Sequence, residues 1–114
     1  MMVDKRLIET FEKNREVYRK HFENLLSINT ETLGHGILGG REKEGQEYIL
    51  NLLKEMNADE IIIDQMTEED IQYSIENYKE GNPGHNYDDI FNVFGIFKGK
   101  SDRSIGFNGH MDTM

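Results

Sequence analysis

The chain has 114 residues, the length of one domain. Its 22 acidic and 13 basic side chains give a net charge of −9. An acidic surface repels phosphate, which argues against a nucleic-acid partner. It has no cysteine, which excludes disulfide bonds and thiolate sites. No apolar run approaches the ~20 residues that span a bilayer, and the N-terminal segment is too charged for a secretory signal, so we expect a cytoplasmic protein with no membrane partner.

The first half of the chain predicts two helices joined by a loop. Residues 3–26 have the periodicity of an amphipathic helix, with Asp4 as its N-cap. The apolar residues of the expected face are Leu7, Phe11, Tyr18, Phe22 and Leu25. Residues 27–41 are polar and glycine-rich, which is typical of a loop. A second helix is predicted over residues 42–56, and Asn57 can end it in the left-handed conformation.

The middle of the chain predicts a strand, a short helix and a loop. The β-branched run at residues 60–64 predicts the strand. Thr67, with Asp70 three residues later, gives a capping signal for the short helix. Residues 78–89, around the single proline, predict the loop. Eight acidic residues and one basic residue between 59 and 80 give this segment a charge of −7, which we interpret as a solvated face.

The last part of the chain predicts two strands, at residues 92–98 and 104–108, joined by a turn. Ile105 and Phe107 flank a glycine, so the second strand is expected to be buried on both faces, as in the middle of a sheet. The prediction for residues 1–114 is therefore an α/β chain with two N-terminal helices and a short mixed sheet. Such a sheet would leave its last strands without neighbours.

His110 and Asp112 follow the last predicted strand and are the candidate site. A histidine at the carboxyl edge of a sheet lies where ligands bind in open α/β folds. A neutral imidazole is a good zinc ligand, and a carboxylate two residues along can hold its other ring N–H. Gly109 would let the backbone turn and leave room beside the ring. Because His-x-Asp also occurs by chance, a hydrogen-bonded structural histidine is the alternative interpretation.

The segment NVFGIFKGKSDRSIGFNGHMDTM, residues 92–114, resembles the strand–turn–strand of the acetylornithine deacetylase / succinyl-diaminopimelate desuccinylase family of co-catalytic zinc peptidases. Aminoacylases and glutamate carboxypeptidase-like enzymes belong to this family. Asn92-Val93, Gly99 and the run Gly109 to Thr113 match its pattern, whereas Met114 stands where the family has valine. Upstream, NPGHNYDDIFNVFG, EGQEYILNLLKEM and LLSINTET also resemble family segments.

The resemblance implies that His110 is a ligand to one zinc of a pair, or to cobalt or manganese, and that Asp112 orients the His110 ring. It implies an N-terminal portion, over residues 1–114, of a zinc-exopeptidase-like (phosphorylase/hydrolase-like) catalytic domain. The parent enzyme would be a metal-dependent deacetylase or peptidase acting on N-acyl amino acids or small peptides. The other metal ligands and the general base have no counterpart among these residues. We therefore expect the chain alone to be inactive and to bind metal weakly.

A second hypothesis is a stand-alone acidic α/β module that binds a partner protein without catalysis. A stable soluble monomer with a compact core would favour this second hypothesis. If the sheet is instead an unfinished part of a larger one, the apolar residues of 92–98 and 104–108 would meet water, so we expect self-association. His35 and His85, in glycine-rich loops, and His21, on the first helix, are interpreted as solvated residues. The adjacent pair Asp88-Asp89 is expected to bond to the backbone of a turn.

Overall fold

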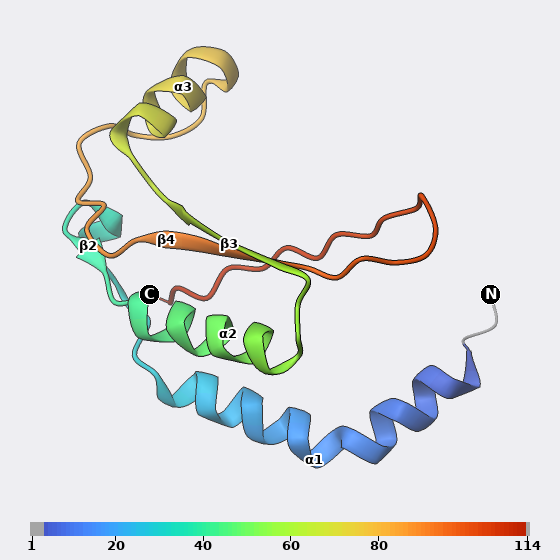
Figure 1. The fold of residues 1–114 in the computed structure, drawn as a ribbon. Coiled ribbons are helices and arrows are strands. Elements are labelled where there is room, and N and C mark those ends of the chain that lie inside the picture. Colours follow the sequence, from blue (N-terminus) through green and yellow to red (C-terminus); the bar gives the residue numbers. More distant parts are fainter. Residues whose placement is uncertain (1–3, 114) are drawn as a thin grey trace.

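The computed structural model describes residues 4–113 and shows helices combined with small sheets (Figure 1), which confirms the α/β class in its general form. In chain order the elements are α1 (Lys5–Ser27), β1 (Thr32–Leu33), the short 3-10 helix η1 (Gly34–Gly36), β2 (Gly39–Gly40), α2 (Lys43–Glu55), β3 (Glu60–Gln65), α3 (Glu68–Tyr78) and β4 (Phe91–Ile96). Every helix and strand lies within a few residues of its predicted place, except those inside the loop predicted at 27–41 and the strand predicted at 104–108.

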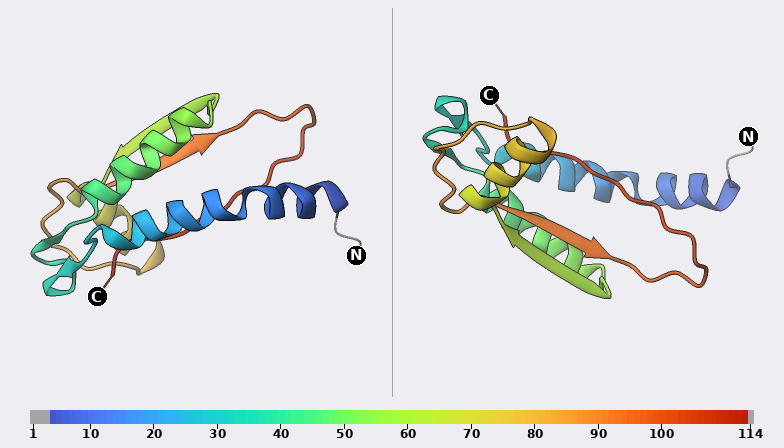
Figure 2. Two further views of the ribbon diagram at one scale, coloured as in Figure 1. Left: turned by 90° about the horizontal axis from the view of Figure 1, so that it is seen from below. Right: turned by 90° about the horizontal axis from the view of Figure 1, so that it is seen from above.

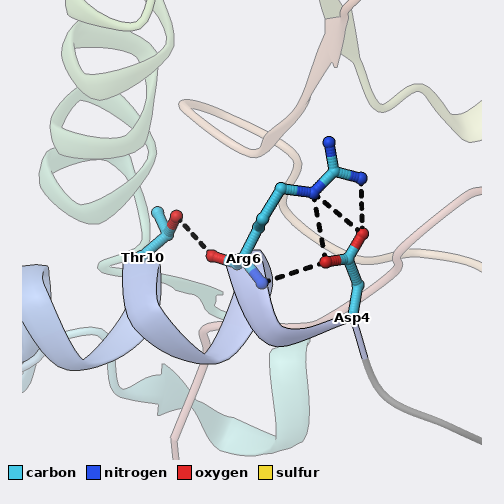
Figure 3. A network of polar contacts seen from close by, with 3 residues as sticks. All are labelled: Asp4, Arg6 and Thr10. Carbon is cyan, nitrogen blue, oxygen red and sulfur yellow. Dashed lines mark hydrogen bonds and ion pairs between the residues drawn. The ribbon is translucent and has the colours of Figure 1, made fainter.

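The start of α1 confirms the predicted N-cap and is drawn in Figure 3. The Asp4 carboxylate accepts the backbone N–H of Arg6 at 2.9 Å and is paired with the Arg6 guanidinium. These bonds hold the pKa of Asp4 below its ordinary value and raise the pKa of Arg6. One turn later, the Thr10 hydroxyl donates to the Arg6 carbonyl at 2.7 Å. The cap satisfies a backbone donor that the first turn of a helix cannot use internally.

The end of α2 confirms the left-handed residue expected at Asn57, where φ is 56°. The N–H groups of Asn57 and Ala58 donate to the carbonyls of Lys54 and Leu53, both at 3.0 Å. This pair of hydrogen bonds is the Schellman motif, which ends a helix by satisfying carbonyls of its last turn. It turns the chain directly into β3.

The start of α3 confirms the capping signal in full. The Thr67 side chain accepts from the Asp70 N–H, and the Asp70 side chain accepts from the Thr67 N–H. The next residue, Glu68, accepts from the Gly84 N–H at 3.2 Å and thereby ties α3 to the following loop. The bonds from Gln72 and Gly84 are the main reasons why the pKa of Glu68 is lowered.

The contact between Glu68 and Gly84 is expected to depend on pH. Since the pKa of Glu68 is lowered by folding, the stability it contributes is present above its unfolded-state pKa and is lost as the pH falls through its folded-state pKa. The amide proton of Gly84 should then shift in NMR spectra recorded between about pH 6 and pH 3. Glu68→Gln should abolish that shift, and Glu69→Gln should leave it intact. A Gly84 shift that persists in Glu68→Gln would contradict the assignment.

β3 and β4 form an antiparallel pair in which Glu60 lies opposite Ile96 and Gln65 opposite Phe91. α2 packs against this pair (Figure 1), and Gly95 of β4 lies directly against Leu53 of the helix. A Cβ atom at Gly95 would overlap the Leu53 side chain, so a larger residue at this position requires that side chain to move. The predicted loop at 27–41 contains a second antiparallel pair, β1 with β2, which encloses η1.

Two predictions about the sheet are wrong. Both ladders in the described part are antiparallel, and the single parallel contact is an isolated bridge between Glu31 and Thr113, so no mixed sheet is present there. The strand predicted at 104–108 is absent as well, and Ile105 and Phe107 are 80% and 92% exposed rather than buried. The β-propensity of such residues depends on a neighbouring strand to pair with. Here no described strand pairs with this segment, and Gly106 weakens it.

The molecule is open, and within residues 4–113 no hydrophobic residue is fully buried. Its radius of gyration is 17.2 Å, against about 13 Å for a compact domain of this length. Its accessible surface is 9738 Å², against roughly 6,450 Å² for a compact monomer of this mass. Figures 1 and 2 show the reason, since α1 and the segment after β4 both extend away from the sheet. Between residues 4 and 113, no helix combines the length and apolar character needed to cross a bilayer.

Candidate metal-ligand pair and its support

His110 and Asp112 form a hydrogen-bonded pair near the C-terminal end of the described chain. His110 Nδ1 lies 3.0 Å from Asp112 Oδ1, the distance expected from the sequence. The His110 side chain is 87% exposed and the Asp112 side chain 37% exposed. When imidazole is neutral and Nδ1 carries the proton, Nδ1 donates to Asp112 and Nε2 keeps a free lone pair. The pair therefore has the form of a metal ligand with a carboxylate that orients it.

The backbone around the pair is held by residues 30–32, which the sequence placed in a plain loop. The Thr30 hydroxyl donates to the Met111 carbonyl at 2.6 Å, and the Thr113 N–H donates to the Thr30 carbonyl at 3.0 Å. The Thr32 N–H donates to the Thr113 carbonyl at 2.8 Å. Thr30 is 5% exposed and is the one buried polar residue in the described part. We call this set of contacts between residues 30–32 and 111–113 the threonine clamp.

The threonine clamp rests on α2 through a glycine. Gly45 is buried in the first turn of α2, and a Cβ atom there would lie 2.4 Å from Met111 Sδ and 3.0 Å from Thr30 Cγ2. Both halves of the clamp therefore approach the helix at the same point. Sequence analysis missed Thr30 and Gly45, although a glycine in the first turns of an otherwise good helix is a signal of close approach.

Two cavities open beside His110. The larger, of about 610 Å³, lies between α2, β4 and residues 107–111, and its wall includes Ile49, Phe94 and His110. A second cavity of about 410 Å³ also borders His110 and has Phe22 and Thr30 in its wall. The volume of the larger cavity falls within the range of small-molecule sites. His110 thus lies at the edge of space large enough for a ligand.

The structure corrects two expectations about the site. His110 does not follow a β-strand, because residues 104–110 pair with no described strand, and the backbone of 111–113 is fixed by the threonine clamp instead. The backbone of Gly109 does not adopt the left-handed conformation, and a Cβ atom there would meet nothing within 4 Å. Gly109 therefore supplies neither a turn nor space that a side chain would fill. Met114, the position that departs from the family pattern, lies outside the described residues.

His21 and His85 have structural partners, whereas His35 is exposed as expected. His21 Nδ1 lies 2.8 Å from the Tyr48 hydroxyl, which joins α1 to α2 and corrects the interpretation of His21 as a surface residue. His85 stacks on Tyr87, with ring centroids 6.1 Å apart, and covers Gly36. His35 adopts a left-handed conformation, with φ of 55°, inside η1.

The adjacent acidic residues Asp88 and Asp89 make contacts with neighbouring residues of the chain. Asp89 pairs with Lys43 at 2.9 Å, which raises the pKa of that lysine, whereas the N–H of Asp88 donates to the Asn86 side chain. Between residues 4 and 113, no three His, Asp or Glu side chains converge as a metal site. Within the described residues, His110 and Asp112 are therefore a pair of potential donors and not a complete metal site.

Comparisons with protein-family models, with curated proteins and with solved structures return no match to this chain.

Proposed function

We propose that this chain contributes one metal ligand, His110, to a zinc-dependent amide hydrolase. The observation that carries the proposal is the 3.0 Å hydrogen bond between His110 Nδ1 and Asp112, which leaves Nε2 as the ligating atom. The resemblance of residues 92–113 to the acetylornithine deacetylase family supports the choice of chemistry. On that basis the chain forms the N-terminal part of a catalytic domain, and the enzyme acts in the cytoplasm on N-acyl amino acids or small peptides.

The described residues fit part of such a site. His110 and Asp112 are the right donor types, but a zinc ion takes three or four protein ligands and no such group converges between residues 4 and 113. A bound zinc, cobalt or manganese pair would supply Lewis-acid polarisation of the scissile carbonyl. The role of Asp112 is to fix the ring tautomer and to raise the basicity of Nε2. The chain by itself is therefore proposed to bind metal weakly and not to hydrolyse N-acyl amino acids.

The test is a zinc titration followed by NMR of the four imidazole rings. The Nε2 resonance of His110 should shift first, with a dissociation constant weaker than micromolar, because one histidine does not make a closed site. His110→Ala should remove the binding. Asp112→Asn should weaken it about 10- to 100-fold, since the amide cannot accept the same charged hydrogen bond.

The other histidines are internal controls for this titration. His21, which is bonded to Tyr48, should not respond at the zinc concentration at which His110 does. Nanomolar binding that is lost in His110→Ala would contradict the proposal of a partial site, as would hydrolysis of N-acyl amino acids by the purified chain. Zinc binding that is unchanged in His110→Ala would contradict the assignment of the ligand.

A second candidate function is an acidic module that binds a partner protein, and it is favoured by the open surface. The accessible area exceeds that of a compact monomer by roughly 3,300 Å². Part of this surface is apolar, since Ile105 and Phe107 are 80% and 92% exposed, and exposed apolar side chains that gather in a patch mark an interaction surface. The two functions are separated by His110→Ala, which should leave partner binding intact if the module function is correct and should abolish metal binding if the hydrolase function is correct.

A further inference from the structure

α1 carries an apolar stripe that is not covered by the rest of the described chain. None of its 23 residues is buried, and its N-terminal half extends past α2 (Figures 1 and 2). The stripe consists of Leu7, Phe11, Tyr18 and Phe22, whose exposed fractions run from 44% to 66%. Leu25, also on the predicted face, is half-buried and lines both cavities beside His110, while the exposed residues Ile8, Val17 and Leu26 flank the stripe. An isolated helix of this length is only marginally stable in water, so its apolar face is expected to pack against something.

The spacing of the stripe is the same in both directions. From Leu7 the steps to Phe11, Tyr18 and Phe22 are four, seven and four residues. Reversing the helix about a point between residues 14 and 15 therefore places Leu7 where Phe22 was and Phe11 where Tyr18 was. A sequence with this symmetry matches an antiparallel copy of itself, which is the requirement for an isologous two-fold contact.

Asn14 lies at the centre of this symmetry and on the same side of the helix. It is three residues after Phe11 and four before Tyr18, and it is less exposed than its helical neighbours. Its side-chain amide donates to the Thr10 carbonyl at 2.8 Å, and its amide oxygen makes no hydrogen bond to a described residue. A single polar residue in an apolar helix contact is a known means of fixing register.

The charge distribution favours contact through α1 over contact through any acidic region. Residues 4–27 contain six basic and five acidic side chains, whereas residues 59–80 carry −7. α1 and α3 lie at opposite ends of the molecule in Figure 1, so two copies joined through α1 keep their acidic segments apart. The ion pairs of α1 (Arg15–Glu12, Arg19–Glu16 and Arg19–Glu23) are all exposed and join neighbours on the helix itself, so none requires a partner copy.

The stripe offers side chains that a contact can bury, because its four members are each 44% to 66% exposed. The edge of β4 is a weaker candidate, because residues 92–94 line the larger cavity, which residues 107–111 close from another side.

We propose that α1 is a self-docking surface on which a second copy packs its own α1 antiparallel, about a two-fold axis between residues 14 and 15 and beside Asn14. Leu7 then faces Phe22 of the second copy, and Phe11 faces Tyr18. Phe22 also lines the smaller cavity beside His110, so the tests change Phe11, Lys13 and Asn14, which line neither cavity. Either proposal can then fail without the other.

The first test is the mass of the chain in solution. Sedimentation equilibrium at about 50 µM should give a dimer, because a helix contact of standard size commonly holds at micromolar concentration. Phe11→Glu should weaken the dimer at least tenfold by burying a charge in the contact. Lys13→Glu, the same kind of change on the opposite side of the helix, should not. Circular dichroism of each variant establishes that α1 remains helical.

The second test reports geometry and uses the absence of cysteine in the chain. Asn14→Cys places two thiols across the axis, within the Cα separation that a disulfide needs, and should cross-link under mild oxidation. Lys13→Cys should cross-link far more slowly. A monomer at about 50 µM would overturn the proposal, and so would a dimer that Phe11→Glu leaves unchanged. Equal cross-linking of the two cysteine variants would overturn the antiparallel arrangement.

Discussion

Gly95→Val is expected to separate α2 from the β3–β4 pair and to lower the free energy of unfolding by about 1–3 kcal/mol. The reason is steric, because a Cβ atom at Gly95 would lie 2.4 Å from Leu53 Cδ2 and 3.1 Å from Leu53 Cγ. Valine has a higher strand propensity than glycine, so propensity alone predicts that the free energy of unfolding rises. Urea unfolding followed by circular dichroism decides between the two effects.

A double variant tests the cause of this loss. Leu53→Ala removes the atoms that valine would strike, so Gly95→Val should cost less in the Leu53→Ala background than in the unmodified chain. Gly99→Val is the control, because a Cβ atom there meets nothing within 4 Å, and its effect should stay within about 0.5 kcal/mol. If Gly95→Val costs the same in both backgrounds, the contact with Leu53 is not what makes glycine necessary.

Gly45→Leu is expected to open the threonine clamp while α2 remains helical. The leucine would occupy the space of Met111 Sδ and Thr30 Cγ2, which lie 2.4 Å and 3.0 Å from the site of its Cβ. The hydrogen bonds from Thr113 to Thr30 and from Thr32 to Thr113 should then break. Amide exchange of Thr32 and Thr113 should accelerate at least tenfold, which corresponds to about 1.4 kcal/mol of local stability.

The local nature of this change is also testable. Gly106→Leu is the matched control, because no atom lies within 4 Å of a Cβ at that position. Gly45→Ala should also accelerate this exchange, because its methyl group would strike Met111 Sδ, and adding Met111→Ala should reduce the effect because it removes that sulfur. Loss of far-ultraviolet helix signal in Gly45→Leu would show that the glycine serves α2 itself rather than the clamp.

The parts of the fold that the sequence predicted are those decided within a few residues. The caps at Asp4 and Thr67 and the left-handed end at Asn57 depend on side chains and backbone groups no more than five residues apart. The same holds for the pair of His110 and Asp112, two positions apart. For such features both hydrogen-bonding groups lie within the same short segment, so the sequence pattern predicts the observed geometry.

The parts that sequence analysis missed depend on distant neighbours. Residues 104–108 have strand-forming side chains, but no pattern within them states whether another strand lies alongside. Thr30 and Met111, or His21 and Tyr48, meet only after the chain has folded back on itself. What covers the apolar face of α1 could not be predicted for the same reason, since periodicity shows which face of a helix is apolar and not what packs on it.

The threonine clamp also has a consequence for the order in which the chain acquires its structure. It joins residues that are 81 positions apart, whereas the caps and helices require only local contacts. Closing so long a loop costs more chain entropy than a local turn does, and such contacts form late in folding. Within the described residues few hydrogen bonds secure the clamp, so it is also an early site of local opening. The placement of His110 is therefore the last feature to form and among the first to be lost, while α2 and the β3–β4 pair persist.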